Sequence, residues 1–323
     1  MQTEIIKNKI NSLASAKKPF LFAVDFELTD GFLIENPLEQ KDILFRLPQV
    51  SNVGKGFSSI DKISQLRPFP QSYTSYREKF KIVMDNLKRG DSFLTNLTVK
   101  TPIETTFTLK EIFELSAAPY CLYVPGQFVC FSPERFVNIS DGVISTNPMK
   151  GTINAGIPNA EEIILSDGKE TAEHNTIVDL LRNDLGMVAE NITLKRFRYI
   201  DKIITAQRKI LQVSSEITGK LPANYLSELG DILFKILPAG SVSGAPKQST
   251  LEIIRKAEQE PRGYYTGVFG YFDGEELDSA VMIRFIEENN GKKYFRSGGG
   301  ITVFSDPQNE YNEVIEKIYL PFV

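Results

Sequence analysis

The chain has few of the residues from which disulfide frameworks and zinc sites are built. Its 323 residues include two cysteines, Cys121 and Cys130, and one histidine, His174. Two cysteines are too few for the several bridges that hold a small secreted scaffold together. A single histidine without a neighbouring cysteine gives little support to a zinc site, because zinc takes several such ligands. We therefore expect His174 to have a hydrogen-bonded structural role.

The sequence also lacks a basic excess and a long apolar run. The formal net charge is −4 and the pI is about 5.4, so the chain has no positive field for nucleic acid. No apolar run approaches the roughly eighteen residues of a membrane-spanning helix, and residues 1–20 contain no apolar core of a signal peptide. The 41% hydrophobic and 24% charged content is typical of a soluble globular protein. We expect a cytoplasmic protein without a nucleic-acid or membrane partner.

The two cysteines lie in a predicted β-hairpin. Residues 120–124 and 127–131 have strand-like patterns on either side of Pro125-Gly126. A disulfide across this hairpin and two buried thiols are both compatible with the pattern. The expected reducing cytoplasm favours the thiols.

Strand-like segments come in consecutive runs that are broken by single helices. Strands are predicted over 19–34 with a turn at 29–31, over much of 91–147, over 192–218 and, as four strands, over 264–303. Helices are predicted over 73–89, near 110–116, and over about 167–189, 223–236, 248–257 and 307–318. This order indicates antiparallel sheets packed against helices, not a βαβ array. The Pro-, Gly-, Ser- and Asn-rich stretch 48–70 indicates an irregular connection.

Two predicted helices each carry a pair of glutamates on one face. In the helix over 167–189, Glu170 and Glu173 share a face that continues through Ile177, Leu181, Leu185 and Val188. In the C-terminal helix, Asp306 is a candidate N-cap and Pro307 the first helical residue, and the same face carries Glu310, Glu313 and Lys317.

Each pair, taken alone, is compatible with a solvated surface that favours the helix dipole. Glutamates at the head of a buried face instead need an ion pair or a metal. If the two pairs faced each other, carboxylates and waters would form an all-oxygen site, which suits Mg²⁺ better than zinc.

Two glycine-rich segments are candidate anion sites. Residues 240–247 are not a phosphate loop, because Pro246 precedes Lys247 and Gln248 follows it where Ser or Thr is needed. Backbone N–H groups there or at 298–300 could still bind an anion, although either segment could be only a turn. Arg284 stands among apolar residues of a predicted strand and needs a partner, for which an anionic ligand is one candidate.

A series of blocks, in this order, resembles the chorismate-utilising enzymes: anthranilate synthase component I, aminodeoxychorismate synthase component I, isochorismate synthase and salicylate synthase. The blocks are SPERF (132–136), PMKGT (148–152), KETAEHNTIVDLLRNDLG (169–186), GSVSGAPK (240–247), YYTGVFGY (264–271), GGGI (298–301) and DPQNEYNE (306–313). The resemblance implies an α+β fold in which large antiparallel β-sheets pack in a sandwich flanked by helices. It divides the chain into a shortened N-terminal segment, 1–72, which contributes strands, and a chorismate-binding catalytic domain, 73–323.

The resemblance also implies the binding residues. Mg²⁺ would be held by Glu173 and Glu313, with Glu170 and Glu310 acting directly or through water. The carboxylates of chorismate would be met by Gly151, Thr152, Ser243, Tyr265, Arg284, Gly298, Gly300 and Lys317. We add Lys247, from the glycine-rich loop, to this substrate-binding set.

The lysine in PMKGT resembles the aminodeoxychorismate synthase branch, since anthranilate synthases usually carry an uncharged residue there. In that branch Lys150 attacks ring C2 while Glu134, as general acid, protonates the departing 4-hydroxyl. Ammonia then attacks C4 and expels the lysine, which gives 4-amino-4-deoxychorismate for 4-aminobenzoate and folate biosynthesis. The alternative is that Lys150 merely pairs with Glu134.

Two departures bear on the other branches. Leu94 stands where isochorismate and salicylate synthases have a lysine that activates water. Gln212 stands near a histidine that assists pyruvate elimination in anthranilate synthase. Aminodeoxychorismate synthase component I is therefore expected first, anthranilate synthase component I second, and isochorismate or salicylate synthase or a silent chorismate-binding subunit after them.

Ammonia needs a source outside this chain. A glutamine amidotransferase uses a Cys-His-Glu set, and the chain has only one histidine, which is assigned a structural role. We expect ammonia to come from a separate glutamine amidotransferase subunit.

Overall fold

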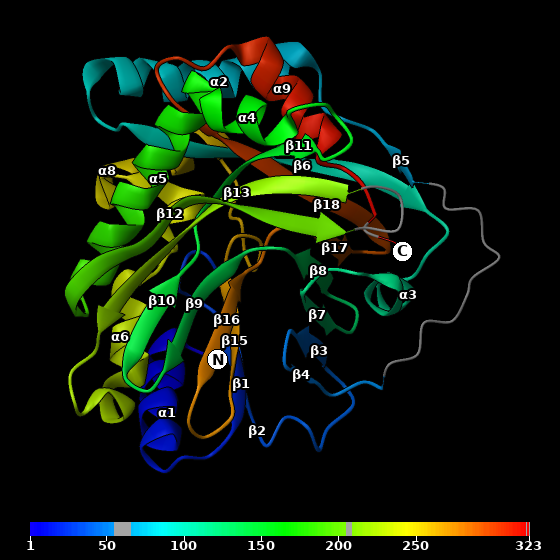
Figure 1. The fold of residues 1–323 in the computed structure, drawn as a ribbon. Helices are drawn as coiled ribbons and strands as arrows, with labels where there is room; N and C mark the ends of the chain where they lie inside the picture. The colour runs from blue at the N-terminus through cyan, green and yellow to red at the C-terminus, as the bar shows by residue number, and fades with distance from the viewer. Residues whose placement is uncertain (55–65, 205–208, 321, 323) are drawn as a thin grey trace.

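A computed structural model describes residues 1–54, 66–204, 209–320 and 322 of the chain. Across these residues two antiparallel sheets of nine strands each pack face to face and carry helices on their outer sides (Figure 1). The predicted α+β sandwich of antiparallel sheets is confirmed. Within the same ranges, no helix has the length and apolar character needed to cross a membrane.

The first sheet combines hairpins of neighbouring strands with pairings between distant parts of the chain. Its path is β11 (Met149–Asn154), β13 (Lys209–Lys220), β10 (Val143–Thr146), β9 (Arg135–Ser140), β16 (Leu277–Val281), β15 (Val268–Phe272), β1 (Phe20–Val24) and β2 (Gly31–Glu35), with β12 (Glu190–Ile204) paired to β13. Strands β1 and β15 close the sheet across the whole length of the chain, with Phe20 opposite Phe272 and Val24 opposite Val268.

The second sheet contains the glycine-rich strand. Its path is β14 (Gly244–Ala245), β6 (Leu94–Thr105), β18 (Lys292–Ile301), β17 (Phe285–Asn289), β8 (Phe128–Ser132), β7 (Tyr120–Val124), β3 (Leu44–Leu47) and β4 (Val50–Ser51), with β5 (Leu66–Pro68) paired to β6. Residues 1–72 thus supply strands to both sheets.

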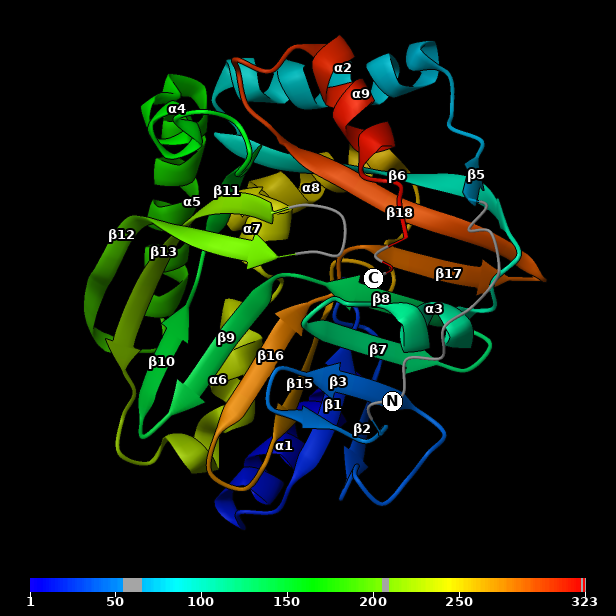
Figure 2. The ribbon, with the colours of Figure 1, turned by 45° about the vertical axis from the view of Figure 1, so that its right-hand side comes forward.

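The helices cover the outer faces of the sandwich (Figure 2). They are α1 (Thr3–Ser15), α2 (Tyr73–Arg89), α3 (Leu109–Leu115), α4 (Ala160–Ser166), α5 (Gly168–Gly186), the 3₁₀ turn Tyr225–Glu228, α6 (Leu229–Ile236), α7 (Gly240–Ser243), α8 (Lys247–Glu258) and α9 (Pro307–Glu316). Helices α1, α5 and α6 pack on the first sheet, whereas α2, α8 and α9 pack on β6 and β18 of the second.

Local signals explain the helices that the sequence predicted. Ser72 caps α2 by accepting from the Ser75 N–H, and Gly90 ends it in the left-handed conformation that glycine adopts readily. Asp167 caps α5, and Asp306 caps α9 with Pro307 at its start. The boundaries of the three helices lie within a few positions of those predicted from the apolar spacing and, for α9, from the cap Asp306.

Helix α1 was not predicted, although its apolar spacing is helical. Ile6, Ile10 and Leu13 are buried at its inner face. The helix docks on α6, where the Gly230 N–H donates to Asn11 Oδ1 at 2.6 Å. A side chain at Gly230 would lie 2.2 Å from the Lys7 carbonyl oxygen, so glycine is required for this contact.

The two cysteines are free, buried thiols. In the β7–β8 hairpin Leu122 lies opposite Cys130, and Cys121 is the next residue along, so the two thiols point to opposite faces of the sheet. Cys130 belongs to the core between the sheets and Cys121 to the core under α3. The disulfide alternative is thereby excluded, and the thiol interpretation is confirmed.

Candidate active site

Lys150 lies on β11 at a β-bulge. The register of β11 against β13 shifts between Lys150 and Thr152, and Gly151 between them has a φ of 74°. The bulge turns Lys150 toward α5, where its Nζ is 3.7 Å from Glu173 Oε2. A methyl group at Gly300 would lie 4.0 Å from the same Nζ. Lys150 therefore stands between α5 and the glycine-rich end of β18, and its ion-pair partner is Glu173 and not Glu134.

Glu134 precedes β9 and is half-buried. The Ser241 hydroxyl of α7 donates to its Oε1 at 2.5 Å. Burial raises the pKa of Glu134, and attraction to Lys150, Arg284 and Lys317 opposes that shift. Burial thus shifts the Glu134 carboxyl toward its neutral form, while the charges of three predicted site cations oppose this shift.

The glycines of β18 form one edge of this group. Strand β17 pairs with β18 only as far as Arg296, so Gly298–Gly300 pair with β6 alone, among the ladders described. Lys317 Nζ donates to the Gly298 carbonyl oxygen at 2.8 Å and lies 2.6 Å from Glu313 Oε1. One edge of the glycine stretch is therefore left without a strand partner, and its backbone is open to a ligand.

Each glutamate pair lies close to a glycine of the candidate site: Glu310 and Glu313 lie near Gly299, and Glu170 lies near Gly151. A side chain at Gly299 would come within 3.4 Å of Glu310 Oε2 and 3.6 Å of Glu313 Oε1, and one at Gly151 would come within 3.2 Å of Glu170 Oε2. Glu310 is 4% exposed, so the alternative that this glutamate lies on a solvated helix surface is wrong. The pKa of Tyr76 is raised by its burial and by the charges of Glu310 and Glu313.

Of three other predicted binding residues, Arg284 and Ser243 have identified hydrogen-bond partners and Tyr265 is buried. Arg284 has a φ of 53°, and its Nε donates to the Tyr319 hydroxyl at 3.3 Å. Tyr265 is buried, which raises its pKa to about 12. The Ser243 hydroxyl is also buried and donates to the Ala239 carbonyl oxygen at 2.9 Å. The charge of Arg284 lowers the pKa of Glu134. The Ser243 hydroxyl, in contrast, is used in a hydrogen bond to the backbone at the start of its own helix.

Lys247 is held outside this group of contacts. Its Nζ donates to the Ile236 carbonyl oxygen at 2.8 Å and lies 3.1 Å from Asp184 Oδ1. The ammonium therefore joins α5, α6 and α8, and Lys247 lies outside the candidate site.

Thr152 is exposed on β11 opposite Gln212.

His174 has the hydrogen-bonded structural role that was expected. Its Nε2 lies 2.7 Å from the Ser215 hydroxyl, and the side chain is buried. Burial lowers its pKa to about 4, with Arg198 and Lys150 adding to the shift. His174 is therefore neutral near pH 7.

Ser241 was missed by sequence reasoning. The segment Gly240-Ser241-Val242-Ser243-Gly244 contains two serines, of which only Ser243 was chosen. Which serine faces Glu134 depends on the rotation of α7, and a four-residue helix has too few positions for periodicity to decide it.

The four glutamates supply only oxygen donors, as Mg²⁺ prefers. Over the ranges that the structure describes, no three acidic, histidine or cysteine side chains are grouped as a metal site. Mg²⁺ usually takes one or two carboxylates and fills its other positions with water and substrate oxygens. By donor chemistry the residues fit an ion shared with a bound substrate.

Comparisons with known proteins identify the family of the chain. A model of the chorismate binding enzyme family matches residues 58–321. An uncharacterised PabA-like protein of Haemophilus influenzae is 50% identical over 321 residues, covering 96% of this chain and 94% of that protein. Aminodeoxychorismate synthase component 1 of Bacillus subtilis is 31% identical over 268 residues, which are 77% of this chain and 55% of that protein.

A solved structure supports the same relationship. Anthranilate synthase component I from Streptococcus pneumoniae matches with a TM-score of 0.66 at 28% identity, covering 79% of this chain and 58% of that one. Since the family model spans most of the sequence, this chain belongs to the chorismate binding enzymes.

Proposed function

We propose that this chain is aminodeoxychorismate synthase component I, a cytoplasmic transferase that converts chorismate and ammonia to 4-amino-4-deoxychorismate for 4-aminobenzoate and folate biosynthesis. The observation that carries the proposal is the placement of an amine and an acid in one site. Lys150 lies between α5 and the glycine strand, and the neutral-favoured Glu134 lies in the field of the same cations. The chain accordingly has both a nucleophile and a proton donor.

The first step joins Lys150 to the substrate. The neutral amine attacks ring C2, the ring double bonds shift, and the bond from C4 to its hydroxyl breaks. Glu134 gives its proton to that hydroxyl, which leaves as water. Because Ser241 donates to Oε1, the proton of Glu134 is carried by Oε2 and is available to the substrate.

The second step releases Lys150. Ammonia attacks C4 and expels the lysine nitrogen from C2 as the free amine. The new C4 ammonium returns a proton to Glu134, so that chorismate and ammonia give 4-amino-4-deoxychorismate and water. Lys317, Arg284 and the free backbone edge of Gly298–Gly300 would bind the two carboxylates of chorismate. Mg²⁺ held by Glu173 and Glu313, with Glu170 and Glu310 contributing directly or through water, would supply positive charge at the ring carboxylate.

Anthranilate synthase component I is the second candidate, favoured by the structural match at 28% identity. One difference between the branches supports the amination at C4 instead. Lys150 stands where anthranilate synthases usually have an uncharged residue. The apolar Leu94 counts against the isochorismate and salicylate synthases: it lies beside Gly300, where a methyl group would be 3.0 Å from Leu94 Cδ1, and it cannot activate water.

Product analysis tests the proposal. The purified chain is incubated with chorismate, Mg²⁺ and ammonium at mildly alkaline pH, and the products are separated and identified by mass. We expect a 4-amino product that becomes 4-aminobenzoate only when a separate lyase is added. Anthranilate would transfer the assignment to the second candidate, and a product formed without ammonium would indicate isochorismate or salicylate synthase. Chorismate binding without turnover would indicate a silent subunit.

The variant Lys150→Ala tests the nucleophile itself. We expect kcat to fall by at least about 100-fold, because the covalent route is lost. The free energy of unfolding should change by less than about 1 kcal/mol, since the pair with Glu173 is partly exposed. Lys292→Ala, at the exposed first residue of β18, is the matched control. Unchanged turnover in Lys150→Ala would remove the covalent mechanism.

A further inference from the structure

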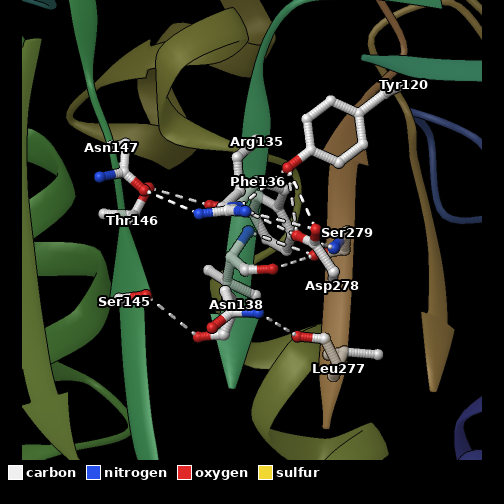
Figure 3. Close-up of polar contacts among 11 residues, drawn as sticks. Tyr120, Arg135, Phe136, Asn138, Ser145, Thr146, Asn147, Leu277, Asp278 and Ser279 are labelled. Atoms are coloured by element: carbon white, nitrogen blue, oxygen red, sulfur yellow. Dashed lines mark hydrogen bonds and ion pairs between the residues drawn. The ribbon is translucent and has the colours of Figure 1, made fainter. Parts of the chain in front are cut away.

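Arg135 follows Glu134 in the chain, and its side chain belongs to a polar network with Tyr120, Asp278 and Asn147 (Figure 3). Its Nε donates to Asp278 Oδ1 at 2.9 Å and to the Tyr120 hydroxyl at 2.9 Å. The Tyr120 hydroxyl in turn donates to Asp278 at 3.2 Å. Asp278 therefore neutralises Arg135, and the guanidinium is held by groups from β7 and β16.

The free end of the guanidinium reaches the segment that leads to Lys150. Arg135 Nη1 donates to Asn147 Oδ1 at 3.3 Å, and Asn147 is followed by Pro148, Met149 and Lys150. This contact joins the residue next to the proposed acid with the segment that ends at the proposed nucleophile.

The backbone ladder does not make this connection. Strands β9 and β10 pair from Val143 opposite Ser140 to Ser145 opposite Asn138, where the ladder ends. Nearer the site, side chains join the two segments. The Thr146 hydroxyl donates to the Phe136 carbonyl oxygen at 2.9 Å, and Arg135 binds Asn147 (Figure 3).

Strand β16, the other neighbour of β9, also has an irregular register near Arg135. The β9–β16 pairing shifts between Asp278 and Ala280, and Ala280 lies opposite Arg135. The Val281 N–H donates to the Glu134 carbonyl oxygen at 3.2 Å. The ion pair of Arg135 with Asp278 spans this irregularity and holds β9 and β16 together just beyond Glu134.

We propose that Arg135 is a positioning residue that sets the placement of Glu134 relative to Lys150, with Asp278 and Tyr120 fixing its guanidinium and Asn147 as the link to the lysine segment. The inference rests on the proposed function for the roles of Glu134 and Lys150. Arg135 itself touches neither of them. Its effect is geometric, and displacements of about 1 Å between reacting groups can lower a rate by about 100-fold.

Two variants separate positioning from folding. Arg135→Lys keeps a cation beside Asp278, but a single ammonium cannot reproduce the planar set of donors that reaches Asp278, Tyr120 and Asn147 together. Asn147→Ala removes the acceptor at the other end without touching the ion pair. Asn138→Ala is the matched control, because its side chain also joins β9 to β16, by donating to the Leu277 carbonyl oxygen at 3.1 Å, farther from the site.

We expect kcat for chorismate consumption to fall by about 10- to 100-fold in Arg135→Lys and Asn147→Ala. The KM for chorismate and the unfolding midpoint should stay close to those of the unmodified chain, and Asn138→Ala should keep its kcat. The double variant Arg135→Lys/Asn147→Ala should be no slower than the slower single variant, because both changes break one link.

Unchanged kcat in both single variants, an equal loss in Asn138→Ala, or additive losses in the double variant would overturn the inference. The product formed by the unmodified chain tests the proposed function separately, since kcat is measured as chorismate consumed, whatever the product. If that product is anthranilate and the variants still lose kcat, the positioning role stands without the proposed amination. A chain that consumes no chorismate overturns both.

Discussion

At the residue scale, burial decides the protonation state of the side chains that could do chemistry. It favours the neutral carboxyl of Glu134, the neutral imidazole of His174 and the thiol forms of Cys121 and Cys130. In each case water is replaced by protein atoms that stabilise charge less well. Glu134 differs from the other three because Lys150, Arg284 and Lys317 all act on its carboxyl group, where a neutral acid has a use.

The pH dependence of turnover should follow Glu134. Because its pKa is raised by burial, the acid stays protonated at higher pH than an ordinary glutamate, and kcat should decline as pH rises through that raised pKa. Glu134→Gln keeps an acceptor for Ser241 but has no proton to give. We expect kcat to fall by about 10²- to 10⁴-fold and this alkaline decline to disappear, as measured in pH–rate profiles at saturating chorismate.

The exposed Glu275→Gln, near the β15–β16 turn, is the control and should keep the profile of the unmodified chain. If kcat of Glu134→Gln still declined at alkaline pH, the decline would be caused by the titration of another group, and this prediction would be wrong.

The cysteines should be inert in the folded protein. Burial raises the pKa of the Cys121 thiol and raises that of Cys130 further above its ordinary value, so neither forms an accessible thiolate near pH 7. Iodoacetamide should label neither residue in the native chain and both after unfolding in urea, as read by mass. Rapid native labelling, or a bridge between the two thiols under mild oxidation, would contradict their placement on opposite faces of the sheet.

At the element scale, β6 has an unpaired stretch that side chains complete. One of its edges pairs with β14 at Leu94 and Thr95 and with β5 from Ile103 to Thr105. Between these, Arg262 Nη2 donates to the Asn96 carbonyl oxygen at 2.8 Å and the Thr98 N–H donates to Glu258 Oε1 at 2.8 Å. Arg262 and Glu258, which form an ion pair, thereby supply hydrogen-bond partners to these two backbone groups of β6, the strand that pairs with Gly298–Gly300.

The buried pair should be sensitive to the loss of one charge. Arg262 Nη2 lies 2.6 Å from Glu258 Oε1, and the two side chains are 1% and 2% exposed. Glu258→Gln leaves the arginine charge uncompensated, and we expect the free energy of unfolding to fall by about 3–5 kcal/mol in urea titrations.

Glu114→Gln is the matched control, because Lys110 and Glu114 also form an i,i+4 pair on a helix, but an exposed one. Its effect should be below about 1 kcal/mol. Similar losses in the two variants would contradict the importance of burial.

At the scale of the whole molecule, the site is shared by the two sheets and their helices (Figure 2). Lys150 lies on the first sheet and Glu134 at the start of one of its strands, whereas Gly298–Gly300 lie on the second sheet. The glutamate pairs come from α5 and α9. No single segment could form this site, because its parts are distributed over more than half of the chain.

The purified chain should use ammonium but not glutamine. Its two cysteines are buried and its one histidine is committed to Ser215, so these residues cannot act as the thiol and base of an amidotransferase. We expect chorismate consumption with ammonium, none with glutamine alone, and glutamine-dependent turnover after addition of a separate amidotransferase subunit. Glutaminase activity of the chain by itself would contradict this expectation.

The sequence by itself determined the features that adjacent residues control. The limits of α2, α5 and α9 could be predicted within a few residues from the apolar spacing and, for α9, from Asp306 as the cap. It also placed the glutamate pairs on single helix faces, because residues three apart must share a face. The ordered blocks were sufficient for the family, since they combine many local patterns along one chain.

Only the tertiary structure decided which of these side chains meet. In the folded chain Lys150 pairs with Glu173, and Ser241 donates to Glu134. Lys247 pairs with Asp184, and Arg135 donates to Asn147. Each contact joins residues of different elements or segments, and their approach depends on sheet order, strand register and the rotation of short helices. No local periodicity encodes these quantities, because they are set by the packing of the whole molecule.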